Sequence, residues 1–360
     1  MSNSLKFTNQ DKSRFLPILK ERVEAYFQEQ RISKHANPLM VFKTVVFLSL
    51  TVLLYLLIIT SILPLFLQLI FAMLIGIMMA FVGFNVCHDA LHGSYSSNKK
   101  VNKVLGFIFN IIGANAYVWN LTHNIVHHSY TNIVDHDEDI EIAPGLIRIN
   151  AGDKLKRLQR YQHIYAFFLY SLTTLSWFFR KDYLKFFQKN IGISHVNRHP
   201  KIEYFNLFFY KLIYYTLFIV LPLLVMHLHW WQFLLGYISM NMAQGLVLGL
   251  VFQVAHVVEE TEIRYANEDN TLEDSWAVHQ LKTTSNFAPK NRLASFLFGG
   301  LNLQIEHHLF PKICHVHYRK LSNIVKHTAE EFDLPYHEHK SFIIALKSHY
   351  SFLKRLGRAA

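Results

Sequence analysis

Four long apolar runs constrain this chain more than any other feature of its sequence. The runs cover residues 41–61, 65–86, 205–226 and 230–255, and the short linkers inside the two pairs hold no Lys, Arg, Asp or Glu. About 20 apolar helical residues cross the hydrocarbon core of a bilayer, and each run reaches that length. The sequence therefore predicts an all-α membrane protein whose four transmembrane helices form two hairpins.

The charged residues indicate how such a chain is oriented. They make up 17% of the sequence, below the quarter or so that is usual in soluble domains. The formal net charge is +11, and basic residues gather before the first run, between the second and third, and after the fourth. The positive-inside rule places all these segments and both termini in the cytosol. A basic cytosolic face accounts for the net charge, so no nucleic-acid partner is expected.

The remaining sequence divides around the four runs. Residues 1–37 are predicted to be a cytosolic amphipathic lead-in, because apolar residues recur there at helical spacing among charged ones. Residues 38–325 form the predicted membrane domain, and residues 326–360 a cytosolic tail. The aromatic stretch 163–179 is short and contains several hydroxyl residues. We interpret it as an interfacial helix, which keeps the cytosolic segments on one side of the membrane.

Histidine is the second unusual feature of the sequence. The chain has 22 histidines, many in tight groups. His88 and His92 follow the second apolar run, and four-residue spacing places two side chains on one face of a helix. A second group holds His123, His127 and His128 within six residues. Three imidazoles so close together are hard to explain by packing, because each ring has two polar nitrogens that need partners.

Two further sites complete the set. Gln304, His307 and His308 form a third group, and His256 directly follows the fourth apolar run. The predicted topology places all four sites on the cytosolic face, where they can converge in a helical cap. Eight histidines and one glutamine suit two metal ions, since one metal takes three or four such ligands. Imidazole binds zinc, iron, copper or nickel, so this ligand set is compatible with redox iron and with two zinc ions.

The spacing of these groups resembles a known family. His-x3-His at His88, His-x3-His-His at His123 and Gln-x2-His-His at Gln304, separated by paired spans, are similar to the three histidine boxes of membrane fatty acid desaturases. The resemblance extends over about residues 38–325. It implies that two irons are bound by His88, His92, His123, His127, His128, His256, His307 and His308. Gln304 stands where other branches have a ligand histidine, and its own ligation stays open.

The resemblance also implies an activity. Members of this family are oxidoreductases that use O2 and external electrons to introduce a cis double bond into a long acyl chain, carried as an acyl-lipid or acyl-CoA. The glutamine in the third box is similar to the front-end branch, which acts between an existing double bond and the carboxyl end. No side chain beyond the metal ligands is expected to act in catalysis.

The expected electron donor is inferred from a sequence motif that does not occur here. Front-end enzymes of eukaryotes commonly carry a fused cytochrome b5 domain with a His-Pro-Gly-Gly motif, and no such motif occurs here. We therefore expect a separate donor of the ferredoxin or cytochrome b5 type. This favours a bacterial inner membrane over the endoplasmic reticulum.

Two other classes of function fit parts of the pattern. A histidine-ligated di-iron lipid or alkane hydroxylase would use the same ligands. A zinc-dependent membrane hydrolase or a metal transporter is the alternative from another class. A transporter should carry ionisable ligands within its spans, whereas these spans are almost free of them.

Several further side chains are candidates for supporting roles. The acidic stretch Asp135, Asp137, Glu138 and Asp139 follows the second box. It can supply a carboxylate that orients a ligand imidazole, and a solvated loop is the alternative interpretation. His315 and His317 are expected to support the third box without binding metal. Three aromatic residues are candidates to line a tunnel for the acyl chain: Tyr117, Trp119 and Trp276.

Overall fold

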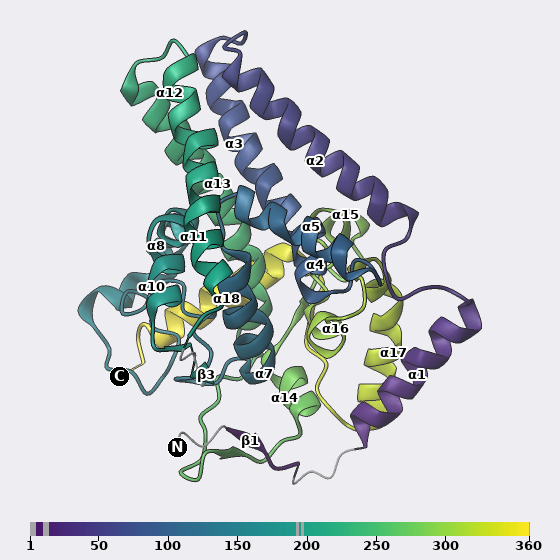
Figure 1. Cartoon of the computed structure of the whole chain (residues 1–360). Coiled ribbons are helices and arrows are strands. Elements are labelled where there is room, and N and C mark those ends of the chain that lie inside the picture. The colour runs from purple at the N-terminus through teal and green to yellow at the C-terminus, as the bar shows by residue number, and fades with distance from the viewer. Residues whose placement is uncertain (1–4, 10–13, 192–193, 196–197, 360) are drawn as a thin grey trace.

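The computed structural model describes residues 5–9, 14–191, 194–195 and 198–359 (Figure 1). Within these residues the chain is mostly helical. Four helices are long and apolar enough to cross a membrane, or up to five if the bent pair Lys99–Ile111 and Ala116–Tyr130, which meets at 112°, is one span. The four are Pro38–Ile59, Leu65–His92, Lys201–Val225 and Trp230–His256. These bounds confirm the four apolar runs, with ends that differ by a few residues.

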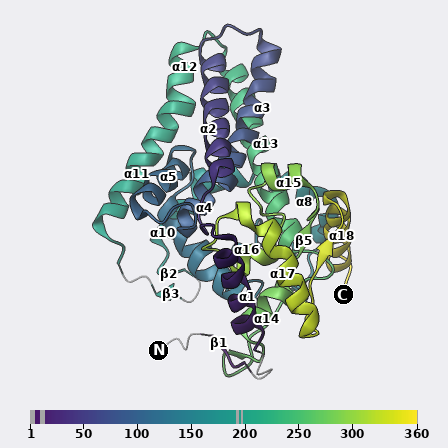
Figure 2. The same ribbon diagram turned by 90° about the vertical axis from the view of Figure 1, so that its right-hand side faces the viewer.

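The four candidate spans form one end of the molecule. The first is α2 (Pro38–Ile59) and the fourth is α13 (Trp230–His256). The second and third are composite, because π-helical turns interrupt them: α3 (Leu65–Val82), η1 (Gly83–Cys87) and α4 (His88–His92), then α11 (Lys201–Tyr215), η5 (Thr216–Val220) and α12 (Leu221–Val225). Figures 1 and 2 show these helices side by side, with the remaining elements gathered at the opposite end.

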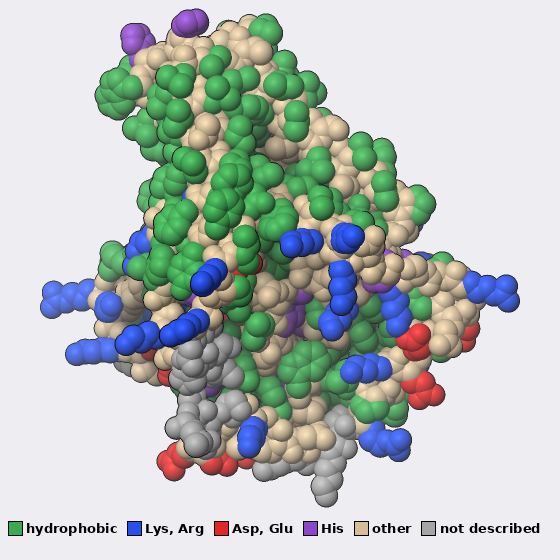
Figure 3. All heavy atoms as spheres, in the orientation of Figure 1, with side chains coloured by type: hydrophobic (Ala, Val, Ile, Leu, Met, Phe, Trp, Pro, Cys, Tyr) green, Lys and Arg blue, Asp and Glu red, His purple; other side chains and the backbone are tan. Residues whose placement is uncertain are grey.

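The exposed faces of these helices are apolar. Only 22% of the apolar stretch of α2 is buried inside the protein, and the share is the same for the third span. Figure 3 shows hydrophobic side chains covering this end of the molecule, whereas Lys and Arg lie on the middle and lower part. Apolar surface of this extent needs a nonaqueous neighbour, so the fold is that of a membrane protein.

Gly76 lies at a close contact between α3 and α13, which pack against each other. A Cβ atom at Gly76 would lie 2.0 Å from the backbone oxygen of Met240 on α13. We therefore expect Gly76→Ala to force the two helices apart and to lower the free energy of unfolding by about 1–3 kcal/mol, as overpacking does. The measurement is the thermal unfolding midpoint of the purified protein in detergent.

Gly236 provides the matched control, because it lies on α13 and a Cβ there would meet no heavy atom within 4 Å. Gly236→Ala should leave the midpoint unchanged or raise it slightly, since alanine favours helix more than glycine. Equal midpoints for both variants would contradict close packing at Gly76.

The other end of the molecule is built from short helices and a few bridging strands. Its helices are α1 (Phe15–Gln30), α5 (Lys99–Ile111), α6 (Ala116–Trp119), η2 (Asn120–His127), α7 (His128–Tyr130), η3 (Arg157–Tyr161), α8 (Gln162–Ser171), α9 (Thr173–Ser176), η4 (Trp177–Lys181), α10 (Asp182–Phe187), α14 (Trp276–Thr283), α15 (Arg292–Leu297), α16 (Gln304–Leu309), η6 (His315–His317), α17 (Tyr318–Glu331) and α18 (Phe342–Leu356). The expected interfacial stretch 163–179 forms α8, α9 and the start of η4, and none of these is among the candidate spans.

Three pairs of two-residue strands depart from the predicted all-α fold. The pairs are parallel β1 (Lys6–Phe7) with β4 (Thr271–Leu272), antiparallel β2 (Asn190–Ile191) with β3 (Ser194–His195), and parallel β5 (Asn286–Phe287) with β6 (Glu338–His339). The two parallel pairs join segments far apart in sequence, whereas β2 and β3 are neighbours in the chain. The fold class stays mostly helical.

The segments before and after the expected membrane domain pack onto it. In the lead-in, whose residues 1–4 and 10–13 lie outside the described part, α1 buries its apolar face against α17, and Arg22 pairs with Glu331 at 2.6 Å. The expected boundary at residue 325 falls inside α17. From α18, the Nδ1 atom of His349 donates to the backbone oxygen of Val257 at 2.6 Å. Helix α18 thus holds the backbone of Val257, the residue that follows His256.

Candidate metal centre

The first two histidine boxes lie on interrupted helices. η1 is a π-helical turn that ends one residue before His88, and η2 is another that contains His123 and His127. Hydrogen bonds from i to i+5 shift side chains relative to an α-helix, and such turns are frequent at functional sites. His128 directly follows η2, and its ring centroid lies 4.9 Å from that of His123.

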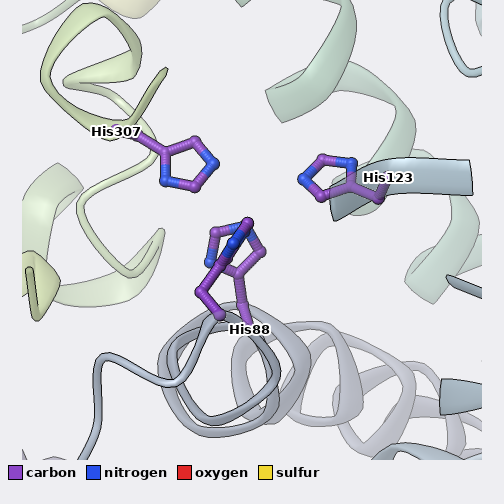
Figure 4. Close-up of side chains that lie close together, drawn as sticks. His88, His123 and His307 are labelled. Atoms are coloured by element: carbon purple, nitrogen blue, oxygen red, sulfur yellow. The ribbon is translucent and has the colours of Figure 1, made fainter. Parts of the chain in front are cut away.

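Seven of the eight predicted histidines converge in two neighbouring groups, and the eighth, His128, lies beside both. One potential ligand atom from each of His88, His92, His123 and His307 lies within 4.8 Å of the others. Figure 4 shows the rings of His88, His123 and His307 pointing toward a common centre. A second group, held to the same limit, consists of His127, His256 and His308. Two sets of three or four imidazoles are what two metal ions require.

His128 and His307 connect the two groups. They form a third set with His308, again within 4.8 Å. The ring of His128 lies 4.8 Å from that of His92 in the first group and 4.4 Å from that of His308 in the second. The two candidate metal sites are therefore adjacent and share a wall of imidazoles.

The protonation and hydrogen bonding of these rings suit a metal. The Nε2 atoms of five of them are buried without a hydrogen-bond partner in the described part of the chain: His92, His123, His127, His128 and His307. Orphaned buried nitrogens are costly unless something binds them. Burial, with neighbouring imidazoles adding to it, lowers the pKa of His307 and His308 well below the usual value. Both rings are then neutral and offer a lone pair, as a metal ligand must.

Carboxylates from the acidic stretch contact two of the candidate ligands. His127 donates from Nδ1 to Asp137 at 2.8 Å, and the Nδ1 atom of His123 lies 3.5 Å from Asp139. A carboxylate on one ring nitrogen fixes the proton there and leaves Nε2 free for a metal. Of the two interpretations of the acidic stretch, Asp137 and Asp139 fit a carboxylate beside a candidate ligand imidazole, whereas Asp135 is exposed.

Two supporting side chains were not predicted from the sequence. His308 donates from Nδ1 to the side-chain oxygen of Gln280 on α14, at 2.8 Å. The Nδ1 atom of His307 lies 3.3 Å from the hydroxyl of Tyr318 on α17. Neither residue belongs to a histidine box, and glutamine and tyrosine carry no ligand signature, so spacing alone offers no signal for them.

Gln304 lies at the second group. Its amide nitrogen is 2.9 Å from Nε2 of His256 and 3.4 Å from Nε2 of His308. The amide thus faces the two lone pairs that a metal would use. All nine predicted metal-site residues, the eight histidines and Gln304, therefore lie in this one cluster.

A buried ion cluster lies behind the first box. Asp89 accepts hydrogen bonds from the backbone nitrogen of His315 at 3.1 Å and from its Nδ1 at 3.0 Å. The other ring nitrogen of His315 is 2.6 Å from the ammonium of Lys43 on α2. Asp89, Cys314 and His315 lie close enough to hold a metal, but Lys43 supplies the positive charge there. His315 therefore supports box one and the segment after box three together, and His317 bonds the backbone of His35.

An apolar cavity of about 160 Å³ opens beside the first group. Its wall includes His88, His123 and Gln304, together with aromatic side chains. Of the three aromatic candidates, Trp119 lines this cavity, whereas Tyr117 bonds His199 and Trp276 donates to the backbone oxygen of His128 at 3.0 Å. The geometry thus joins a ligand-ready metal centre to a space that suits an apolar chain.

Comparison with known proteins agrees with this arrangement. The family model of the fatty acid desaturases matches residues 64–340. The chain is 35% identical to the sn-1 linoleoyl-lipid 6-desaturase of Synechocystis sp., over 99% of this chain and 98% of that protein. It is 33% identical to the enzyme of the same name from Arthrospira platensis, over 95% and 92%. It is 34% identical to the acyl-lipid (8-3)-desaturase of Physcomitrium patens, over 98% and 74%.

The alignment with the Synechocystis enzyme therefore covers the membrane helices, all the histidine boxes and the cavity. The chain belongs to the fatty acid desaturase family and is a membrane oxidoreductase that acts on fatty acyl chains.

Proposed function

We propose that this chain is a front-end acyl-lipid desaturase that introduces a cis double bond between an existing double bond and the carboxyl end. The observation that carries the proposal is the convergence of eight histidines beside an apolar cavity, whose wall includes His88 and His123. The names of the cyanobacterial relatives, which specify linoleoyl-lipid and position 6, support the substrate class.

The proposed cofactor is a pair of iron ions. His88, His92, His123 and His307 would hold one, and His127, His256 and His308 the other, with His128 between them and the amide of Gln304 facing the second. Iron bound there supplies the activation of dioxygen, which acid or base side chains cannot replace because a methylene C–H bond does not ionise. Unpaired Nε2 atoms support this assignment.

The protein's own part is to position the chain and to exclude water. Phe84, Phe109, Trp119, Trp177 and Phe252 contribute to the cavity wall. Flat, rigid rings hold a methylene chain against the metal centre, and small errors of placement are costly in rate. The cavity wall would fix the conformation of the acyl chain and place the reacting carbon beside His88 and His123.

We further propose how the protein lies in the membrane. Two hairpins would dip into the bilayer from the cytosol, and residues 38–325 would form the catalytic part with residues 1–37 and 326–360 packed on it. Both termini and the histidine boxes would be cytosolic, in a bacterial inner membrane. Lys and Arg on the end away from the apolar surface support this orientation (Figure 3). They also suit an acidic electron donor of the ferredoxin or cytochrome b5 type.

Expression in a host without polyunsaturated fatty acids tests the activity. With linoleic acid in the medium, the chain should produce a trienoic acid with its new double bond on the carboxyl side. A His128→Ala variant should produce none. A hydroxylated product in place of a desaturated one would favour the rival oxygenase, and an active His128→Ala variant would contradict the proposed centre.

A further inference from the structure

The wall of the apolar cavity contains one charged stretch. Lys181 ends η4, and Lys185 lies one helical turn further, on α10. Both line the cavity, as do Asp139 and Asp182. Residues four apart on a helix share a face, so the two ammonium groups approach the cavity from the same side. An otherwise apolar cavity with such groups fits a long chain that has one polar end.

The two carboxylates of this wall are already engaged. Asp182 accepts a hydrogen bond from Nζ of Lys211 at 2.6 Å and another from Nε1 of Trp177 at 2.8 Å. Asp139 lies between two partners, 3.5 Å from Nδ1 of His123 and 3.4 Å from Nζ of Lys181. Neither carboxylate is therefore free to repel an electron-rich ligand atom.

The two lysines keep donors for a ligand. The contact with Asp139 is the one hydrogen bond of Lys181 within the described part of the chain, and an ammonium has three N–H groups. Lys185 forms an ion pair with Glu138, and its side chain is only 13% exposed. A carbonyl oxygen at this end of the cavity would accept from either ammonium.

Lys181 also lies near the candidate metal centre, because one carboxylate, that of Asp139, contacts both Lys181 and His123. An extended saturated chain advances about 1.3 Å per carbon–carbon bond at ordinary bond lengths and angles. The fifth or sixth carbon then lies about 5–7 Å from the carbonyl carbon. Because Asp139 contacts both Lys181 and His123, a carbonyl held at Lys181 would keep these carbons near the His123 ring.

From these contacts we infer that Lys181 and Lys185 bind the carbonyl oxygen at the carboxyl end of the substrate and thereby set the position of the double bond. The inference rests on the proposed function and names what that site recognises. The ligand chemistry is that of an acyl ester or thioester, so a glycerolipid and a coenzyme A derivative are both candidate sources. Lys181 and Lys185 are positioning residues, since neither touches the reacting carbon.

The test compares an ester lipid with an ether lipid that differs from it only in this oxygen, and adds a coenzyme A thioester as a second carbonyl source. Iron-loaded protein receives reduced ferredoxin and one of three probes: phosphatidylglycerol vesicles with a linoleoyl ester at sn-1, the matching sn-1 ether lipid, or linoleoyl-CoA. A hydrogen bond to a charged group predicts that wild-type protein turns over the ester about tenfold better than the ether. Lys181→Gln should bring this ratio near one, mainly by raising KM for the ester, and should spread the double bond over neighbouring positions.

Two further variants separate carbonyl binding from a structural role. Lys185→Gln leaves the Asp139–His123 contact in place and should also lower the ester-to-ether ratio. Arg180→Gln is the matched control, since Arg180 is exposed and outside the cavity wall, and its ratio should match the wild type. The iron content of each variant is measured beside its activity.

The outcomes distinguish the inference from the proposed function. An effect confined to the thioester would identify coenzyme A as the carrier and still support the carbonyl contact. A wild-type ratio and a single double-bond position in both lysine variants would overturn the inference, as would loss of iron in Lys181→Gln with no change in Lys185→Gln. If wild-type protein desaturates none of the probes, the proposed function fails and the inference fails with it.

Discussion

Replacing His307 with alanine is expected to lower desaturase activity by more than about 100-fold, because even the outer partners of metal ligands are worth about 10- to 100-fold. His307 belongs both to the group with His88, His92 and His123 and to the group with His128 and His308. Its loss should therefore weaken both candidate metal sites. Metal analysis of the purified variant should show the iron content per chain falling by more than half.

His327 supplies a control with the same chemical change. Its side chain is 73% exposed and contacts Glu331 on the same helix. His327→Ala should retain wild-type iron and activity. A His307→Ala protein that keeps its full iron content would show that this imidazole is no ligand, whatever its activity.

A second large effect is expected from Asp137→Asn, although the two side chains have the same shape. Oδ2 of Asp137 accepts from His127 at 2.8 Å and from the backbone nitrogen of Asn132 at 2.9 Å, and Oδ1 accepts from the backbone nitrogen of Asp139 at 3.1 Å. An asparagine places its NH2 group against one of these donors in either orientation. The buried clash should lower metal affinity or activity by about 10- to 100-fold.

Asp135→Asn makes the same replacement two residues earlier, at an exposed position of the same loop. It should leave iron affinity and the rate unchanged. Iron affinity is measured by competition with a chelator, and the rate by product formation. Unchanged iron binding in Asp137→Asn would mean that the carboxylate does not fix the His127 tautomer.

Local sequence patterns were sufficient for the parts of this protein that depend on nearby residues. Apolar length predicted the four membrane helices, and four-residue spacing predicted that His88 and His92 share a face. The grouping of all eight histidines followed from placing the ends of the second and fourth spans on one side. His256 could be included only through that topological argument, since a lone histidine carries little information.

Other parts of the centre depend on contacts that no local pattern encodes. Lys43 and His315 are 272 positions apart and yet form one buried pair. Gln280 is 28 positions from His308, and its helix contains no motif that predicts this hydrogen bond. The π-helical turns were also missed, because a single extra residue per turn leaves no period in a short sequence. Tertiary packing decides all of these features.

The closeness of α3 and α13 at Gly76, and their extension into His88 and His256, has a consequence for the design of the enzyme. The membrane helices and the catalytic centre form a single folded unit. Other membrane enzymes have a soluble catalytic domain that a removable helix attaches to the bilayer. A water-soluble fragment that retains both candidate metal sites cannot be cut from this chain, because each site takes a ligand from the end of a membrane helix. Detergent or lipid that covers the membrane helices is therefore needed to keep both candidate metal sites assembled.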